Sequence, residues 1–216
     1  MMKKKIFVNA GHSFSDPGAI SNGVKEAEEI MKIRDLLIPL LKKNFEVLTV
    51  PDDLGLVESI KRVNEYMPEL DDGLAFSIHL NAGGGSGAEI YYYDGSLKSK
   101  KYAKTIIDEY CREMTMTNRG AKPDTSVVHK RLGWIRDVKA WSFLIEVGFI
   151  DNTADMKIIS NHGRVADAIN QAICKMFGVE VDDTGKQVST IIEEIKKDLV
   201  DIDDKLNQIN NINNPK

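Results

Sequence analysis

The chain has 216 residues, 42% of them hydrophobic, which suits one globular domain with a sizeable core and a short appendage. Its net charge of −4, from 33 acidic and 29 basic residues, provides no basic excess, so we expect no nucleic-acid partner. No run of 18 apolar residues occurs, and we expect no membrane span.

The first residues do not have the pattern of a secretory signal. Lys3–Lys5 form a basic start, but the apolar stretch 6–8 that follows is too short for the hydrophobic core of a signal peptide. We therefore expect a protein without a signal peptide that is made in the cytoplasm. Cys111 and Cys174 lie far apart and outside any Cys-x-x-Cys motif, which indicates buried, unreactive thiols rather than a disulfide or metal ligands.

The first half of the chain alternates strand and helix patterns. A strand over 3–10 ends just before His12, and turn residues predict a loop over 13–23. An apolar face then predicts a helix over 25–43, which Pro39 should kink near its end. The pattern continues with a strand over 45–50, a helix over 54–67, a strand over 74–80, a glycine-rich loop over 82–87 and a strand over 88–93.

The second half continues the alternation with longer helices. The pattern predicts a helix over 97–114, a surface loop over 115–128, a short strand over 133–136, a strand over 142–147 and one long helix over 153–177. Strands that alternate with helices of this length indicate an α/β three-layer sandwich with a mostly parallel central sheet. In such sheets, functional sites gather at the carboxyl ends of the strands.

Residues 187–213 carry a heptad repeat. Its apolar positions are Val188, Ile192, Ile195, Leu199, Ile202, Leu206 and Ile209. Such a narrow two-row stripe is typical of a coiled-coil-like helix, and we expect it to form a homo-oligomer or a docking segment. A terminal helix packed back on its own domain is the alternative. Residues 179–186 then form the linker, and the predicted catalytic domain covers 1–178.

Two histidines lie where predicted strands end. His12 follows the first strand, and His79 lies at the tip of the strand over 74–80. Catalytic zinc takes three protein ligands from His and Asp or Glu and keeps one position open for water. The carboxylate ligand has three candidates at the start of the first helix: Glu26, Glu28 and Glu29. The pattern indicates a zinc hydrolase, with structural histidines and helix-capping acids as the alternative.

Glu146 is the acidic residue with the most unusual surroundings. It lies inside the apolar run 143–149, where a carboxylate is costly to bury without a partner such as a metal. Zinc hydrolysis needs a carboxylate that takes a proton from the attacking water and passes it to the leaving amine, and Glu146 is the candidate for this role. A glutamate that faces solvent from an edge strand is the alternative. His129 and His162 stay unassigned.

Six short motifs occur together in a fixed order: VNAGH (8–12), DPGA (16–19), GVKE (23–26), SIHLNA (77–82), RGAK (119–122) and LIEVGFIDN (144–152). As an ordered set they make the chain resemble the zinc-dependent N-acetylmuramoyl-L-alanine amidases of the type-3 family, found among bacterial wall-remodelling enzymes and phage endolysins. The resemblance covers about residues 4–177. It implies a twisted mixed sheet of about six strands between helices.

The resemblance also implies a set of site residues. His12, Glu26 and His79 would bind one Zn²⁺ per chain, and Glu146 would be the catalytic acid/base; Glu26 is chosen because it follows Gly-x-Lys, as in the family pattern. The implied substrate is peptidoglycan, and the implied reaction is hydrolysis of the amide between the lactyl group of N-acetylmuramic acid and L-alanine of the stem peptide. The candidates for substrate binding are Asn81, Lys122, Arg131 and Arg136.

The chain departs from the family pattern in two places. Ser13-Phe14-Ser15 replaces the usual glycine-rich stretch after the first histidine, and residues 137–141 stand where the family often has a proline and small residues before the strand of the catalytic glutamate. We expect the heptad segment to take the place of a wall-binding module. The alternative functions are a zinc peptidase that acts on wall or free peptides and a non-catalytic wall-binding or assembly protein. Since we expect no signal peptide, we expect a phage lysin that acts on the cell wall after release or as a virion-associated enzyme.

Overall fold

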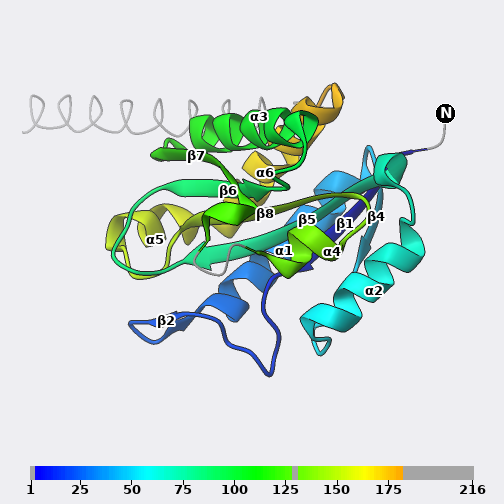
Figure 1. The fold of residues 1–216 in the computed structure, drawn as a ribbon. Coiled ribbons are helices and arrows are strands. Elements are labelled where there is room, and N and C mark those ends of the chain that lie inside the picture. The colour runs from blue at the N-terminus through cyan, green and yellow to red at the C-terminus, as the bar shows by residue number, and fades with distance from the viewer. Residues whose placement is uncertain (1–2, 128–130, 182–216) are drawn as a thin grey trace, which may run out of the picture. The chain divides into compact units, whose positions relative to one another are not determined.

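A mixed six-stranded sheet forms the centre of the fold (Figure 1). The computed structural model describes residues 3–127 and 131–181. The sheet has the strand order β4-β1-β5-β8-β6-β7, with β1 (Lys5–Ala10), β4 (Glu46–Thr49), β5 (Gly73–Asn81), β6 (Ala88–Tyr92), β7 (Asn118–Pro123) and β8 (Trp141–Phe149). A separate small hairpin consists of β2 (Ile20–Ser21) and β3 (Val24–Lys25).

Most neighbouring strands of the sheet run parallel. β1 pairs in parallel with both β4 and β5, β5 pairs in parallel with β8, and β7 pairs in parallel with β6. Only the pairing of β6 with β8 is antiparallel. The prediction of an α/β fold with a mixed, mostly parallel sheet of about six strands is therefore confirmed.

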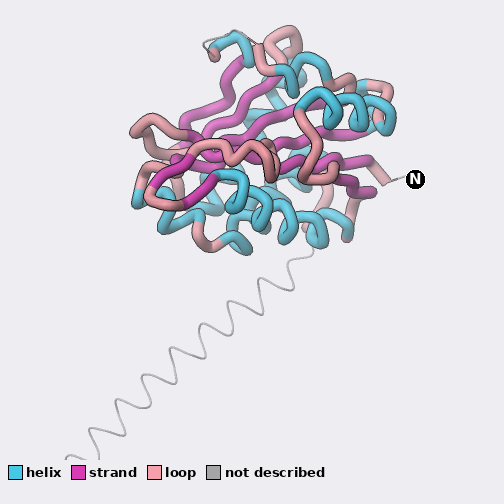
Figure 2. Tube along the Cα trace, turned by 90° about the horizontal axis from the view of Figure 1, so that it is seen from below, coloured by secondary structure: helices cyan, strands magenta, loops and turns pink. Residues whose placement is uncertain are grey.

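Helices cover both faces of this sheet (Figures 1 and 2). They are α1 (Glu26–Lys42), α2 (Leu56–Tyr66), α3 (Leu97–Met114), α4 (Gly133–Asp137), α5 (Thr153–Ile159) and α6 (His162–Phe177), with single 3₁₀ turns at η1 (Leu70–Asp72) and η2 (Asp124–Ser126). α1, α3 and α6 pack together on one face, and α2 and α4 lie on the other. The two faces therefore have separate helical covers.

The face under α1, α3 and α6 is apolar along the central strands. Alternate residues of these strands point to it and are fully buried: Ile6, Val8, Leu74, Phe76, Ile78, Phe143 and Ile145. Burying such side chains contributes about 1.5–3 kcal/mol each to stability. This half of the core holds the sheet to its main helical layer.

The opposite face changes character along the strands. Near the start of β8 and β5 it is apolar, where Ala75 and Leu144 pack in one cluster with residues of α2 and α4. Two to four residues further along, the same face carries Ser77, His79 and Glu146. This face of the sheet is thus apolar under α2 and α4 and polar at the carboxyl ends of the parallel strands. The polar end is where the sequence predicted a site.

Two segments between α3 and β8 differ from the prediction. Residues 115–128, expected to be a surface loop, contain β7, an edge strand whose sequence NRGAKP has no alternation of apolar and polar residues. Residues 133–136, expected to be a strand, begin the short helix α4, which buries Trp134 and Ile135. Four residues are too few for periodicity to separate a strand from a helical turn.

The long helix expected over 153–177 is two helices. α5 ends before Ser160, and α6 begins after Asn161, whose side chain accepts a hydrogen bond from the Arg164 backbone N–H at 3.1 Å. Asparagine is a strong N-cap, so Asn161 starts a second helix. Apolar periodicity alone had predicted a single continuous helix over 153–177. α1, in contrast, extends through Pro39 as far as Lys42.

The residues up to Val179 form one compact unit. Of the predicted linker, residues 179–181 are described; the rest of it and the heptad segment 187–213 lie outside the described residues. Their domain boundaries and their role in oligomerisation therefore stay predictions. Within residues 3–127 and 131–181, the structure has no helix with the length and hydropathy needed to cross a membrane.

Candidate metal centre and active site

Three side chains from separate segments converge at the carboxyl ends of β1 and β5. One donor atom each from His12, Glu26 and His79 lies within 4.8 Å of the other two. The Oε1 atom of Glu26 is 3.2 Å from Nε2 of His12 and 3.2 Å from Nδ1 of His79. The two imidazole rings stand nearly edge to face, with centroids 5.0 Å apart. The structure thus brings together the three residues predicted as metal ligands.

Glu26 reaches this position because the chain turns back just before α1. The hairpin β2–β3 reverses at Asn22-Gly23, a dipeptide that favours such turns. The Glu26 and Ala27 N–H groups at the start of α1 then donate to the carbonyls of Ala19 and Pro17. In return, Glu26 Oε2 accepts from the Ala19 N–H, and Oε1 accepts from the Leu80 N–H, each at 2.9 Å. The carboxylate is therefore fixed on both oxygens.

The loops around the two histidines leave no room for larger side chains. A Cβ atom added to Gly11 would lie 1.8 Å from Nε2 of His79, inside its ring. A Cβ atom on Gly18 would lie 2.6 Å from Oε2 of Glu26 and 2.7 Å from Cδ2 of His12. These glycines of the VNAGH and DPGA motifs are therefore explained by close packing of backbone against the donors.

Asp16 orients His12 from the side away from Glu26. Its Oδ2 is 2.9 Å from His12 Nδ1, so Nε2 faces Glu26. A carboxylate on the far nitrogen of a histidine is a common companion of metal ligands, because it fixes the ring and raises its basicity. Asp16 is the first residue of the DPGA motif, but the sequence alone does not predict this contact with His12.

Charges within the cluster shift two pKa values. Burial lowers the pKa of His12, but the hydrogen bonds and charges of Glu26 and Asp16 outweigh it and raise the pKa to about 9. Burial also works against ionisation of Glu26, yet hydrogen bonds from His12, His79 and the Ala19 N–H hold the pKa of Glu26 well below its usual range. The charged carboxylate of Glu26 favours a divalent cation at this position, and His12 must release its proton when such a cation binds.

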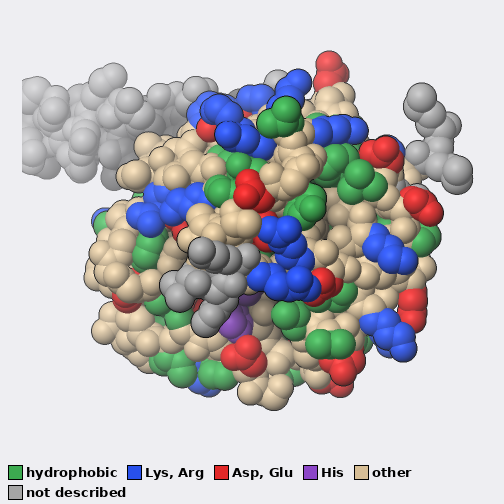
Figure 3. Space-filling model, in the orientation of Figure 1, with side chains coloured by type: hydrophobic (Ala, Val, Ile, Leu, Met, Phe, Trp, Pro, Cys, Tyr) green, Lys and Arg blue, Asp and Glu red, His purple; other side chains and the backbone are tan. Residues whose placement is uncertain are grey.

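The donor set fits zinc. Two imidazole nitrogens and one carboxylate oxygen are a ligand set of catalytic zinc sites. Glu26 is only 3% exposed, so its charge is buried against the two imidazoles and two backbone N–H groups. The side chains of His12 and His79 keep 21% and 16% of their surface exposed, which leaves the cluster accessible from solvent; histidine atoms are visible at the molecular surface in Figure 3 (purple).

Glu146 lies directly across the sheet from His79, in the pairing of β5 with β8. Its Oε2 atom is buried and has no hydrogen-bond partner among the described residues. Burial raises the pKa of Glu146 to about 8, and the negative charges of Glu26 and Glu89 act in the same direction. A buried carboxyl group that binds a proton readily therefore stands one strand away from a predicted metal ligand.

Comparison with known proteins agrees with this geometry. Residues 6–176 match the model of a family described as N-acetylmuramoyl-L-alanine amidase.

The chain belongs to this amidase family.

The sequence identity to individual relatives is about 30%. The sporulation-specific N-acetylmuramoyl-L-alanine amidase of Bacillus subtilis is 32% identical over 162 residues, which cover 70% of this chain and 58% of that protein. The endolysin of Bacillus phage SPP1 is 27% identical over 179 residues, which cover 77% of this chain and 62% of that protein. The chain thus spans about three fifths of the length of these curated relatives.

A solved structure has the same fold. The catalytic domain of CwlV, an N-acetylmuramoyl-L-alanine amidase from Bacillus (Paenibacillus) polymyxa var. colistinus, superposes with a TM-score of 0.68 at 26% sequence identity. The match covers 82% of this chain and 99% of that domain. The region of the amidase fold therefore corresponds to residues up to about the end of α6.

Two of the four candidate substrate residues lie close to the candidate active site. Asn81 ends β5, and its Nδ2 donates to Glu89 at 3.2 Å. Lys122 comes from β7, and its Nζ donates to the same carboxylate at 2.5 Å. Glu89 and Lys122 lie on the side of Glu146 away from His79, whereas Asn81 reaches Glu89 from β5, the strand that also carries His79.

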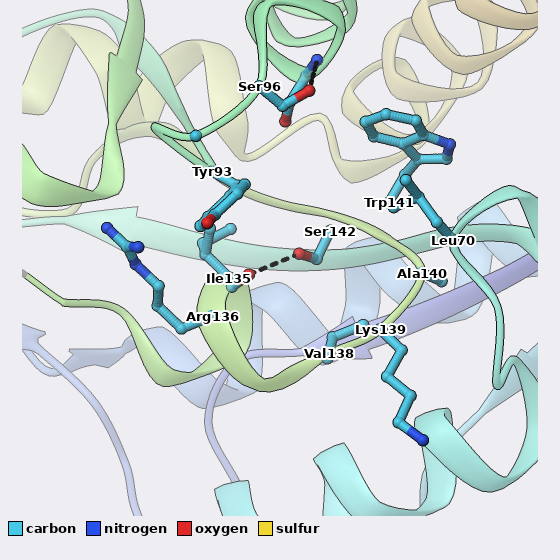
Figure 4. A pocket seen from close by; sticks show the side chains of 12 residues that line it. Leu70, Tyr93, Ser96, Ile135, Arg136, Val138, Lys139, Ala140, Trp141 and Ser142 are labelled. Atoms are coloured by element: carbon cyan, nitrogen blue, oxygen red, sulfur yellow. Dashed lines mark hydrogen bonds between the residues drawn. The ribbon is translucent and has the colours of Figure 1, made fainter.

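The other two candidates have partners elsewhere. Arg131 is exposed and pairs with Asp137. Arg136 pairs with Asp124, lies over the ring of Tyr93 and lines a cavity of about 400 Å³ (Figure 4).

That cavity lies at the start of β8, where Trp141 and Ser142 contribute to its wall. Glu146 is five residues further along the strand, about 17 Å away at about 3.3 Å per residue. The cavity is therefore separate from the candidate metal site, and Arg136 is directed to the cavity rather than to Glu146.

The remaining acids and histidines of the sequence motifs are also placed. Glu28 pairs with Lys25 at the surface. Glu29 lies on the buried side of α1, where its Oε2 is 2.7 Å from Nε2 of His162. His162 is thus outside the metal centre of the amidase fold, and His129 lies outside the described residues.

Glu89, like Asp16, is a residue near the candidate site for which the sequence predicted no role. It is 2% exposed in β6 and lies in the row of the sheet that contains His79 and Glu146. A signal for it was present, because Glu89 interrupts the apolar strand 88–92 in the way that Glu146 interrupts β8. A charged residue in a central strand needs partners wherever it occurs.

Proposed function

We propose that this chain is a zinc-dependent N-acetylmuramoyl-L-alanine amidase that acts on peptidoglycan. Its reaction is hydrolysis of the amide between the lactyl group of N-acetylmuramic acid and L-alanine of the stem peptide. The observation that carries this proposal is the convergence of His12, Glu26 and His79 with Glu146 one strand away, whose Oε2 atom is buried and has no hydrogen-bond partner among residues 3–127 and 131–181. Family membership supports the choice of bond.

His12, Glu26 and His79 are the residues that hold one zinc ion per chain in this proposal. When bound, zinc acts as a Lewis acid that lowers the pKa of water toward about 7 and polarises a carbonyl group. Asp16 keeps His12 turned toward the site, and the N–H groups of Ala19 and Leu80 keep Glu26 in place. Fixed donors of this kind reduce the reorganisation needed during the reaction.

Glu146 has the role of general base and then of general acid. As a carboxylate it takes a proton from the water whose oxygen attacks the lactyl carbonyl carbon, and it returns that proton to the L-alanine nitrogen as the carbon–nitrogen bond breaks. The products are a free lactyl carboxylate and a peptide with a free amino terminus. The burial that raises the pKa of Glu146 favours the protonated form that the second step needs.

Digestion of purified peptidoglycan tests the proposed reaction. Zinc-loaded protein should release stem peptides that begin with L-alanine, a chelator should abolish the release, and added zinc should restore it. Mass spectrometry of the products separates the rivals: cleavage between amino acids indicates a zinc peptidase, and no cleavage by protein that retains zinc indicates a binding protein. Either of these results removes the amidase proposal.

The biological setting is a separate matter. Both a bacterial sporulation amidase and a phage endolysin are among the relatives, and the phage-lysin role stays a prediction from sequence. The homo-oligomer through 187–213 also stays a prediction, because that segment lies outside the described residues.

A further inference from the structure

Glu89 occupies the third position of a polar row across the sheet. Glu146 pairs with His79 of β5 on one side and with Glu89 of β6 on the other. Side chains of residues that pair in register point to the same face. The row therefore places a predicted metal ligand, the predicted acid/base and Glu89 side by side, about 4.8 Å apart from strand to strand.

Glu89 has the opposite environment to Glu146. Its Oε2 accepts from Arg119 Nε at 2.6 Å and from Lys122 Nζ at 2.5 Å, and its Oε1 accepts from Tyr91 Oη at 2.8 Å and from Asn81 Nδ2 at 3.2 Å. Burial opposes ionisation, but these donors hold the pKa of Glu89 below its usual value. With both oxygens occupied, Glu89 is suited to hold its partners in position rather than to exchange a proton.

The two cations around Glu89 share this one carboxylate. Arg119 and Lys122 both bind its Oε2, and their side chains remain 33% and 32% exposed. Arg119 binds Glu89 through Nε, and its guanidinium lies over the ring of Phe149 with 4.9 Å between the guanidinium carbon and the ring centroid. Each cation therefore has N–H donors beyond those that Glu89 uses, and their two positive charges exceed its one negative charge.

We propose that Arg119 and Lys122 form a binding site for a carboxylate of the substrate, with Glu89 as the residue that positions both cations. On the proposed amidase function, on which this inference rests, the ligand is the carboxylate of the second stem-peptide residue. That carbon lies about 7 Å from the scissile carbonyl in an extended peptide. The Glu89 row position is two strand spacings, about 10 Å, from His79, within reach of long cationic side chains.

The structure contains a matched control for this cluster. Glu109 is also a buried carboxylate that pairs with one arginine and one lysine, Arg112 and Lys175. This second cluster belongs to α3 and α6, on the opposite face of the sheet. Arg112→Gln and Lys175→Met therefore remove the same charges from a comparable cluster away from the site.

Two synthetic muramoyl tripeptides test the proposal; in both, the second residue is a glutamate that is joined to the third through its side-chain carboxyl, so that its main-chain carboxyl is not part of a peptide bond. They are identical except that the second residue carries either a free carboxylate or a carboxamide. With zinc-loaded wild-type protein, we expect kcat/KM to favour the carboxylate at least tenfold, as befits a charge-assisted hydrogen bond. In Arg119→Gln, Lys122→Met and Glu89→Gln the ratio should fall toward one, whereas Arg112→Gln and Lys175→Met should keep the wild-type ratio.

A second measurement is independent of turnover. Binding of the released tripeptides, followed by calorimetry, should show the same preference for the carboxylate and the same loss in the variants. If Glu89→Gln does not fold, the two cation variants still carry the test, because each leaves Glu89 paired with the other cation.

The outcomes separate this inference from the proposed function. Cleavage of both substrates at equal rates by the wild-type protein would overturn the carboxylate site and leave the amidase intact. Cleavage of neither substrate by zinc-loaded protein would remove the amidase and this site with it. A ratio that changes equally in the Glu109-cluster controls would also overturn the site, since the effect would then not be local.

Discussion

Glu146 and His79 stand directly opposite each other in the parallel pairing of β5 with β8. Their side chains therefore share one face of the sheet and emerge beyond the apolar cluster under α2 and α4. Glu89 continues the row on β6. Of the two glutamates beside each other in this row, Glu89 has both oxygens hydrogen-bonded, whereas Oε2 of Glu146 has no partner in the part of the chain that the structure describes. Different surroundings thus assign different roles to like residues.

The first prediction concerns this difference. Glu146→Gln should retain one zinc per chain but lose about 10²–10⁴-fold in kcat, because the amide of glutamine cannot accept and return the proton. Zinc content by mass spectrometry and release of stem peptides measure the two properties separately. Glu28→Gln changes an exposed glutamate paired with Lys25 and should alter neither. Turnover that survives in Glu146→Gln would exclude Glu146 as the acid/base.

The second prediction concerns the metal ligands. His79→Ala should reduce the zinc content well below one per chain, since it removes one of three converging donors. His162→Ala is the matched control, because His162 pairs with Glu29 outside the donor cluster, and it should keep full zinc content. Equal zinc loss in both variants would indicate general destabilisation rather than ligation.

The third prediction concerns the support of His12. Asp16→Ala should weaken zinc affinity about 10–100-fold, which is typical for loss of a carboxylate that orients a ligating histidine. The measurement is a competition titration with a fluorescent zinc chelator. Asp35→Ala removes an exposed carboxylate that pairs with Arg34 and should leave the affinity unchanged. An unchanged affinity in Asp16→Ala would mean that its bond to His12 is dispensable.

The sequence predicts the site better than it predicts the elements around it. His12, His79 and Glu146 lie at or near the carboxyl ends of strands with strong apolar patterns, and parallel strands bring such ends together. The choice of Glu26 needed the family resemblance. Glu26 and Glu29 are three residues apart and both face the protein interior, so helical periodicity cannot separate them.

The contacts made by long-range pairing could not be predicted. β7 pairs with β6 only at the sheet edge, and its sequence lacks the alternation that identifies strands. Arg131 and Arg136 are candidates from the sequence for pairing with carboxylates of the substrate, yet their partners in the structure are Asp137 and Asp124. Side-chain pairing depends on the tertiary fold, which local patterns do not encode.

The fourth prediction tests the core through its cysteines. Cys111 and Cys174 are both free and buried, and burial raises the pKa of Cys111 to about 12 and raises that of Cys174 as well. Since the thiolate is the reactive form, a higher pKa means less thiolate at pH 8. Iodoacetamide at pH 8 should therefore leave both thiols unmodified in the native protein and modify both in urea. Rapid native alkylation of either thiol would contradict its burial.

The fifth prediction concerns the attachment of the glycine-rich loop to the end of β8. Asp155 is 4% exposed, and its Oδ2 accepts from the N–H groups of Gly87 and Phe149 at 2.8 and 2.9 Å, while Oδ1 accepts from Ser86 Oγ at 2.9 Å. Asp155→Ala leaves two backbone N–H groups without an acceptor, at about 1–3 kcal/mol each. The free energy of unfolding should then fall by about 3 kcal/mol.

Asp155→Asn separates hydrogen bonding from charge at this position. Its amide oxygen can replace Oδ2 as the acceptor for both backbone N–H groups, so we expect less than half of the loss seen in Asp155→Ala. Urea unfolding followed by circular dichroism gives both values. Equal losses in the two variants would show that an acceptor at the Oδ2 position does not hold residues 86–87 to β8, and that the stability comes from what both variants lack, the negative charge and the Oδ1 acceptor for Ser86 Oγ.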